Sequence, residues 1–326
     1  MQHTLLSVTN ATKVFKAGFF GKQRFVAVDS VSLNLKQNDP RILTIAGESG
    51  SGKTTLAQMI LGFLPNDSGS ITFCERDIYR MGWKDANHYR RQVQAVFQNP
   101  FDAFNPFYKI NRVFDIPIRR VRLARTSSDA ARLIREALDA VHLNPEETLG
   151  RFPHQLSGGQ LQRVMIGRAL LLKPQLIIAD EPVSMIDVSL RAIILNILVK
   201  LKQDFGISLL YITHDLSTAL QISDEILIMY RGSVVEQGAA EMVIQTPMHP
   251  YTQLLVASIP LPDPNQKWIR PLELQINPDA AAAFASGCKF IDRCPERMDR
   301  CRSSQPAMFD AGENHKAACF LYENKS

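Results

Sequence analysis

A glycine-rich segment between an apolar run and a helix-forming run constrains this 326-residue chain more than any other feature. It reads Gly47-Glu48-Ser49-Gly50-Ser51-Gly52-Lys53-Thr54-Thr55, the G-x-x-x-x-G-K-[ST] pattern of a phosphate-binding loop. Residues 42–46 before it predict a buried strand, and residues 56–61 after it predict a helix. Glycines let the backbone wrap closely around a polyphosphate, and the amides at the helix start face the anion. The segment therefore predicts a nucleoside triphosphate site.

Two side chains of this loop have the chemistry that phosphoryl transfer requires. Lys53 is placed to reach the β- and γ-phosphates, and the Thr54 hydroxyl is placed to ligate Mg²⁺. A glycine-rich turn with a chance lysine is the alternative. The strand, loop and helix in the correct order argue against it.

The composition is that of an ordinary globular protein, with 45% apolar and 21% charged residues. Its length suits one large α/β domain with an appendage, or two domains. A net charge of +5 does not indicate a nucleic-acid-binding protein. No run approaches the ~18 apolar residues that span a bilayer, and the first residues lack the pattern of a secretory signal. We therefore expect a cytoplasmic protein.

The remaining pattern predicts an α/β fold with an insertion. Short β-like runs within the first forty residues predict a small antiparallel sheet beside the phosphate-loop strand. Residues 101–152 predict a mostly helical insertion, in which 126–141 has helical spacing and 127–129 a helix cap. The basic run 119–125 predicts a solvated face, with contact with a membrane-bound partner as the alternative. Further core strands and helices are predicted at 94–97, 161–172, 175–181, 207–213 and 225–229.

A pair of carboxylates follows the apolar run 176–179. Asp180 and Glu181 would lie at the strand end where ligands bind in open α/β sheets. We expect Asp180 to hold Mg²⁺ through water. Glu181 would point the other way, as neighbours on a strand do, and is the candidate general base for the attacking water. A solvated acidic turn is the alternative, and the apolar run before it argues against that interpretation.

Four further features follow the phosphate loop: Gln98, Leu156-Ser157-Gly158-Gly159-Gln160, Asp187 and His214. Their order matches the Gln loop, signature pentapeptide, dyad aspartate and switch histidine of ATP-binding-cassette (ABC) ATPases. Residues 5–238 therefore resemble the nucleotide-binding subunit of an ABC transporter. The resemblance implies a RecA-like core, an antiparallel β subdomain and a helical subdomain at about 100–165. Ser184-Met185-Ile186-Asp187 departs from the commoner Ser-Ala-Leu-Asp but keeps the aspartate.

The tail narrows this resemblance. His249-Pro250-Tyr251-Thr252, Gly287-Cys288-Lys289-Phe290 and Arg293-Cys294-Pro295 resemble the oligopeptide/dipeptide-type importer ATPases. We therefore divide the chain into a nucleotide-binding domain, 1–240, and a small cysteine-containing C-terminal extension, 241–326. A proline-rich linker is predicted at 259–264.

The resemblance also implies roles for individual residues. Gln98 would contact Mg²⁺ and couple to the transmembrane partner, and His214 would bond the γ-phosphate and position the water. Phe15 would stack on adenine, with Phe25 among the nearby alternatives. The catalytic residues are thus Glu181 and His214, and the Mg²⁺ residues are Thr54, Gln98 and Asp180. The predicted nucleotide-binding residues are Phe15, Gly47, Glu48, Ser49, Gly50, Ser51, Gly52, Lys53, Thr54, Thr55, Gln98, Ser157, Gly158, Gly159, Gln160, Asp180 and Asp187.

The signature segment predicts a second anion site, because Ser157, Gly158 and Gly159 stand at a helix start. The resemblance implies that this site closes over ATP on a facing subunit, so that two cassettes sandwich two nucleotides. Asp187 would lie at that interface. The γ-phosphate would hold the sandwich shut and hydrolysis would release it.

Four of the five cysteines crowd into the end of the chain, as Cys288-x5-Cys294-x6-Cys301-x17-Cys319. Structural zinc usually takes more closely spaced cysteines, whereas four cysteines are the rule for a [4Fe–4S] cluster. The resembled family also implies such a cluster in this tail. We therefore expect an iron–sulfur cluster ahead of zinc, and either ahead of free reduced thiols.

The favoured function is an ATPase on the cytoplasmic face of a membrane that powers import of peptides or related small solutes. It would work with two transmembrane permease subunits, a second ATPase subunit and an extracytoplasmic substrate-binding protein, and without nucleic acid. A soluble ABC ATPase acting on nucleic acid or ribosomes is the alternative, although this chain lacks long coiled-coil insertions or a second cassette. A phosphate-loop kinase or GTPase has no use for the signature segment. A non-hydrolysing subunit is disfavoured because Lys53, Glu181 and His214 are present.

Overall fold

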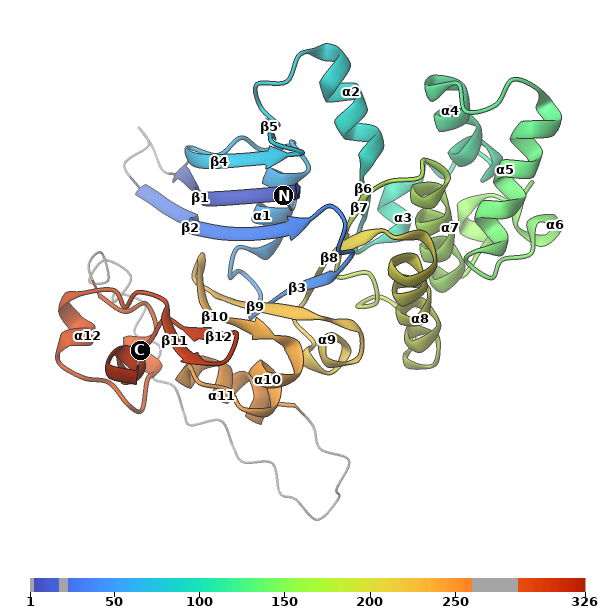
Figure 1. Cartoon of the computed structure of the whole chain (residues 1–326). Coiled ribbons are helices and arrows are strands. Elements are labelled where there is room, and N and C mark those ends of the chain that lie inside the picture. Colours follow the sequence, from blue (N-terminus) through green and yellow to red (C-terminus); the bar gives the residue numbers. More distant parts are fainter. Residues whose placement is uncertain (1–2, 18–22, 260–286, 326) are drawn as a thin grey trace.

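The computed structural model describes residues 3–17, 23–259 and 287–325 (Figure 1). One of its two sheets is antiparallel and has the strand order β2-β1-β4-β5. Its strands are β1 (Thr4–Ala17), β2 (Gln23–Lys36), β4 (Ser68–Phe73) and β5 (Arg76–Asp77). This sheet confirms the predicted antiparallel subdomain. β1 and β2 are longer than the predicted runs because their polar segments also pair, as Lys13 does with Val28.

The second sheet has eight strands in the order β11-β12-β10-β9-β3-β8-β7-β6. The five from β9 to β6 are parallel, and β10, β12 and β11 continue the sheet antiparallel. Its strands are β3 (Ile42–Ala46), β6 (Val93–Val96), β7 (Leu176–Asp180), β8 (Ser208–Thr213), β9 (Glu225–Tyr230), β10 (Ser233–Ala239), β11 (Phe309–Gly312) and β12 (His315–Ala317). β3 and β8 are buried along their whole length, as expected of central parallel strands.

Helices cover this sheet and form a separate lobe beyond β6 (Figure 1). They are α1 (Lys53–Ile60), α2 (Trp83–Gln92), α3 (Pro100–Ala103), α4 (Asn111–Val121), α5 (Ser127–Asp139), α6 (Pro145–Thr148), α7 (Gly158–Leu171), α8 (Val188–Phe205), α9 (Leu216–Ile222), α10 (Ala240–Gln245), α11 (Pro250–Ala257) and α12 (Arg300–Ser303). None of the helices in the described part of the chain is long and apolar enough to cross a membrane.

Alternating side chains of the parallel strands supply two cores, one on each face of the sheet. Ile177 and Ala179 pack with buried residues of α5, α7 and α8. Leu176 and Ile178 pack with α1 and the antiparallel sheet. Since successive strand residues point to opposite faces, one continuous apolar run serves both cores.

The helical lobe from α3 to α7 is the predicted insertion. The N-cap of α5 is Thr126, one residue before the predicted cap, because the Thr126 hydroxyl accepts a hydrogen bond from the Asp129 amide at 3.0 Å. The helix buries Ile134, Ala137 and Leu138, which face α7. Its apolar stripe therefore joins the lobe to the core.

The C-terminal extension lies at the other end of the molecule from the helical lobe (Figure 1). Its strand β12 pairs with β10, with Lys316 opposite Gln237. The extension therefore completes the main sheet, and its Tyr251 and Phe290 pack in a core that it shares with α9 and β9. Residues 260–264 of the predicted linker lie outside the described residues, and the division of the chain at residue 240 stays a prediction.

Candidate active site

The phosphate-binding loop connects β3 to α1, as predicted. A Cβ on Gly47 would lie 2.2 Å from the Met229 carbonyl oxygen, and one on Gly52 would lie 2.2 Å from the Ala27 carbonyl oxygen. Gly52 also has a φ of +102°, in the left-handed region. Only glycine fits such positions, so the loop can lie directly against the neighbouring strands. Ser49 and Gly50 are exposed in the loop, Ser51 is buried, and Thr55 lies in the first turn of α1.

Lys53 points back across this loop from the start of α1. Its Nζ donates to the carbonyl oxygens of Gly47 and Glu48, both at 2.8 Å. Burial lowers the pKa of Lys53, while the carboxylates of Glu181, Asp180 and Glu48 act in the opposite direction. The ammonium group is thus held over the loop, with acidic side chains nearby.

Thr54 and Asp180 meet beside the loop. The Thr54 hydroxyl donates to Asp180 Oδ1 at 3.4 Å, and Asp180 ends β7, which is separated from β3 only by β8. Burial raises the pKa of Asp180, so a bound cation there would favour its ionised form. Hydroxyl and carboxylate oxygens are suitable ligands for Mg²⁺. The pair fits the predicted metal role.

Glu181 differs from its prediction in one respect. It lies beyond the end of β7 with a φ of +45°, so a left-handed turn, rather than strand alternation, directs its side chain. Its carboxylate accepts from Gln98 Nε2 at 2.9 Å and lies 2.9 Å from His214 Nδ1. Positive φ in a non-glycine residue is strained and clusters at functional sites. Three predicted residues thus meet beyond the ends of β6, β7 and β8.

Ser157 lies at the N-terminus of α7 and forms a capping box with Gln160. The Ser157 hydroxyl accepts from the Gln160 amide at 3.2 Å, and the Ser157 amide donates to Gln160 Oε1 at 2.9 Å. Ser157 is exposed, and no hydrogen bond within the described residues joins segment 157–160 to loop 47–55. Gly159 instead packs against α8, since a Cβ there would lie 3.0 Å from Leu190 Cδ1. The signature serine therefore faces outward.

Phe15 and Asp187 are also accessible. Phe15 pairs with Phe25 across β1 and β2, and 40% of it is exposed. Asp187 is exposed directly before α8. Adenine stacking by Phe15 and the interface role of Asp187 stay predictions.

Comparison with known proteins decides the family. The family model described as "ABC transporter" matches residues 28–184, and that described as "Oligopeptide/dipeptide transporter, C-terminal region" matches residues 235–301. The putative oligopeptide transport ATP-binding protein YkfD of Bacillus subtilis is 36% identical over 98% of this chain and 96% of its own. The chain belongs to the oligopeptide branch of the ABC transporter ATPases. The oligopeptide transport ATP-binding protein OppF of Salmonella typhimurium, a second relative, is 36% identical over 90% of this chain and 87% of its own.

Solved structures confirm the ABC ATPase fold. The dimeric cassette MJ0796 bound to ADP and Pi has a TM-score of 0.65 and 28% identity, over 72% of this chain and 99% of that one. The cbiO1 protein of Clostridium perfringens, part of the ABC transporter complex cbiONQ, has a TM-score of 0.63 and 25% identity, over 75% and 92%. The chain is thus an ATPase, as predicted.

The iron–sulfur prediction for this ABC ATPase is wrong. Within the described residues, no group of three or more His, Cys, Asp or Glu side chains could hold a metal ion. All four tail cysteines line one narrow space of about 10 Å³, room for no more than a water molecule. Burial raises the pKa of Cys288 and Cys294, and that of Cys319 to about 11, whereas metal ligation needs thiolates. The tail cysteines, Cys301 included, are therefore packed free thiols.

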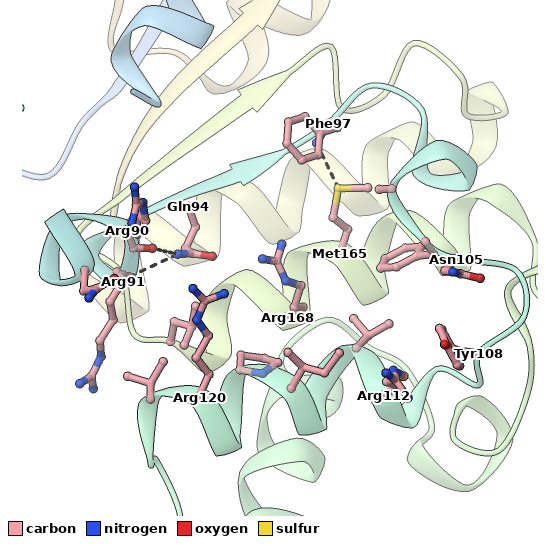
Figure 2. A pocket seen from close by; sticks show the side chains of 18 of the residues that line it. Arg90, Arg91, Gln94, Phe97, Asn105, Tyr108, Arg112, Arg120, Met165 and Arg168 are labelled. Carbon is pink, nitrogen blue, oxygen red and sulfur yellow. Dashed lines mark hydrogen bonds between the residues drawn. The ribbon is translucent and has the colours of Figure 1, made fainter. Parts of the chain in front are cut away.

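This ABC ATPase also has a cavity of about 1110 Å³ among α2, α4 and α7, beside the end of β6. Figure 2 shows Arg120 of α4 and Arg168 of α7 reaching into it. Burial lowers the pKa of Arg168. The cationic and aromatic side chains of the lining are Lys84, Arg90, Arg91, Lys109, Arg112, Arg120, Arg168, Trp83, Phe97, Phe104 and Tyr108. No carboxylate is among the described residues that line it, and Phe97 directly precedes Gln98.

Sequence reasoning missed two residues of the ATPase tail that touch the phosphate loop. The Arg293 guanidinium donates two hydrogen bonds to the Glu48 carboxylate, and the Glu48 amide donates to the Tyr251 hydroxyl. More than two hundred residues separate each from Glu48, so no local pattern joins them. The only available signal is that both belong to the tail motifs typical of the oligopeptide branch.

Proposed function

We propose that this ABC ATPase powers the import of peptides or related small solutes across a membrane. The observation that carries the proposal is the meeting of Gln98, Glu181 and His214 beside Lys53 and the Thr54–Asp180 pair. Such a site hydrolyses ATP, and the relatives named above are oligopeptide transport proteins. Transport of peptides is therefore the use of ATP that best fits this chain.

Each residue has a role in hydrolysis. Lys53 and the loop amides bind the β- and γ-phosphates, and Mg²⁺ held by Thr54, Asp180 and Gln98 would neutralise phosphate charge. Glu181 accepts a proton from the attacking water, and His214 orients that water. An ionised carboxylate has about four lone-pair sites, so Glu181 can keep its bonds to its two neighbours while it accepts the proton.

We propose further that two cassettes sandwich ATP, with Ser157 of each directed at the nucleotide of the other. Two features support this: the exposed Ser157 at the start of α7, and the dimeric form of the similar cassette MJ0796. The positive end of a 14-residue helix favours a γ-phosphate there. The partner cassette is either a second copy or a homologous chain.

The arginine-lined cavity supports contact with one of the two transmembrane permease subunits that we expect as partners. We expect it to receive a short cytoplasmic permease segment with acidic and apolar side chains, because its lining is cationic and aromatic. The ATPase would then sit on the cytoplasmic face of the membrane, and an extracytoplasmic binding protein would deliver the peptide. A soluble ABC ATPase acting on nucleic acid or ribosomes remains the alternative function.

Peptide uptake into cells or vesicles that contain the assembled transporter tests the proposal. We expect uptake to require ATP and to stop when Glu181→Gln replaces the wild-type chain, while assembly with the permeases persists. Uptake that continues with Glu181→Gln as the only cassette present would contradict it. Purification with ribosomes or nucleic acid, and not with membrane proteins, would favour the alternative.

A further inference from the structure

We infer that Arg293 of the C-terminal extension is a positioning residue for ATP binding, because it neutralises and fixes Glu48 of the phosphate-binding loop. Arg293 Nη1 lies 2.9 Å from Glu48 Oε2, and Nη2 lies 2.8 Å from Oε1. Such a two-bond pairing is the strongest geometry that an arginine and a carboxylate can form. The inference rests on the proposed ATPase function.

Glu48 needs such a partner because its charge lies in an anion-binding loop. A carboxylate there repels a polyphosphate, and its field already acts on Lys53. The Arg293 side chain is only 17% exposed and the Glu48 side chain 39%, so water screens the pair incompletely. The hydrogen bonds to Glu48 raise the pKa of Arg293, which keeps the guanidinium charged. Arg293 therefore cancels a charge that would oppose ATP.

The extension also fixes the backbone of Glu48. The Glu48 amide donates to the buried Tyr251 hydroxyl at 2.9 Å, while the Glu48 carbonyl accepts from Lys53 at 2.8 Å. Arg293 is itself held near two aromatic rings, 5.7 Å from the centre of Tyr230 and 5.6 Å from that of Phe290. Tyr251 and Arg293 of the extension thus fix Glu48, whose carbonyl group binds Lys53.

Steady-state ATPase kinetics of the purified full-length chain test this role. We expect Arg293→Gln to raise the KM for ATP roughly five- to tenfold, the loss of about one kcal/mol of charge pairing. The kcat should change less than about twofold, because Arg293 contacts none of the residues that act on water. Arg293→Lys keeps the charge but loses the two-bond geometry, so it should give an intermediate KM.

A double-mutant cycle and a matched control complete the test. Once Glu48→Gln has removed the carboxylate, adding Arg293→Gln should leave KM unchanged, and this comparison holds even if the single Arg293→Gln variant does not fold. Arg300→Gln breaks another arginine–glutamate pair of the tail, with Glu323, and should leave KM and kcat unchanged. Equal KM values for wild type and Arg293→Gln would overturn the inference, as would an equal rise in both backgrounds. Absence of ATPase activity in the wild type, both alone and with the homologous partner cassette added, would instead overturn the proposed function.

Discussion

Glu181 and His214 face each other beyond the ends of two neighbouring strands, with Glu181 Oε1 2.9 Å from His214 Nδ1. The contact depends on the left-handed φ of Glu181, which turns its side chain out of the line of β7. Because β7 and β8 pair in parallel, both strands end at the same edge of the sheet. The proposed general base and the residue proposed to orient the water are therefore adjacent.

We predict that Glu181→Gln retains ATP binding and loses at least about 100-fold in turnover, the usual contribution of a general base. The amide keeps the shape of the carboxylate and its bond to His214 but cannot accept the proton. Equilibrium binding of a fluorescent ATP analogue and phosphate release give the two readouts. Near-normal phosphate release would remove Glu181 from the role.

The phosphate loop offers a matched pair of glycine substitutions. Gly50 and Gly52 both have positive φ, but a Cβ on Gly50 has no neighbour within 4 Å, whereas one on Gly52 meets the Ala27 carbonyl oxygen. We expect Gly50→Ala to lower the free energy of unfolding by about 1 kcal/mol, the cost of left-handed backbone alone. Gly52→Ala should cost at least about 3 kcal/mol, because the backbone must also move. Equal losses in urea unfolding would contradict the close packing.

Much of this site is predictable because its parts are local. Continuous stretches of sequence predict the strand, loop and helix around Lys53, and another predicts the apolar strand that ends at Asp180. Contacts between distant segments are not predictable in this way. The Arg293–Glu48 pair and the addition of β12 to β10 arise only when the tail folds back onto the core.

Two local features were also missed, for physical reasons. α2 has few apolar residues and buries only Tyr89, so it lacks a helical apolar stripe. The spacing of the tail cysteines says nothing about burial, and burial raises the pKa of Cys288, Cys294 and Cys319, which favours packed thiols over metal-ligating thiolates.

His249 makes stability depend on pH. Burial lowers the pKa of His249 from 6.5 to about 4, although the nearby Glu236 carboxylate acts in the opposite direction. Between these two pH values the unfolded chain therefore binds a proton at His249 more readily than the native chain does. The free energy of unfolding should therefore fall as pH decreases from about 6.5 towards 4, and at pH 5 it should be about 2 kcal/mol lower than at neutral pH. His249→Asn retains an acceptor for the Tyr251 amide and removes this titration. Urea unfolding at pH 7.5 and pH 5 checks it, and an equal acid loss in both proteins would contradict the assignment.

The cavity prediction is tested by charge reversal. Arg120→Glu places a carboxylate in a cationic lining and should abolish most co-purification with the permease subunits, while ATPase activity of the isolated chain is unchanged. Arg135→Glu, on the exposed face of α5 and outside the lining, is the control and should keep the permeases. Docking in this cavity would be refuted if both variants lost the permease subunits on purification, or if both kept them.

The central claim is that ATP is hydrolysed between two cassettes, and sedimentation of the Glu181→Gln chain measures it most directly. With ATP and Mg²⁺ we expect a dimer that dissociates to monomer when ATP is replaced by ADP, and Ser157→Arg should prevent the dimer by placing a bulky side chain at the nucleotide contact. If the cassette pairs only with a homologous chain, the dimer should appear when that chain is added. Two results together would contradict the account. The Glu181→Gln chain would stay monomeric with ATP, both alone and with the homologous chain, and the wild-type monomer would hydrolyse ATP at a specific rate independent of protein concentration.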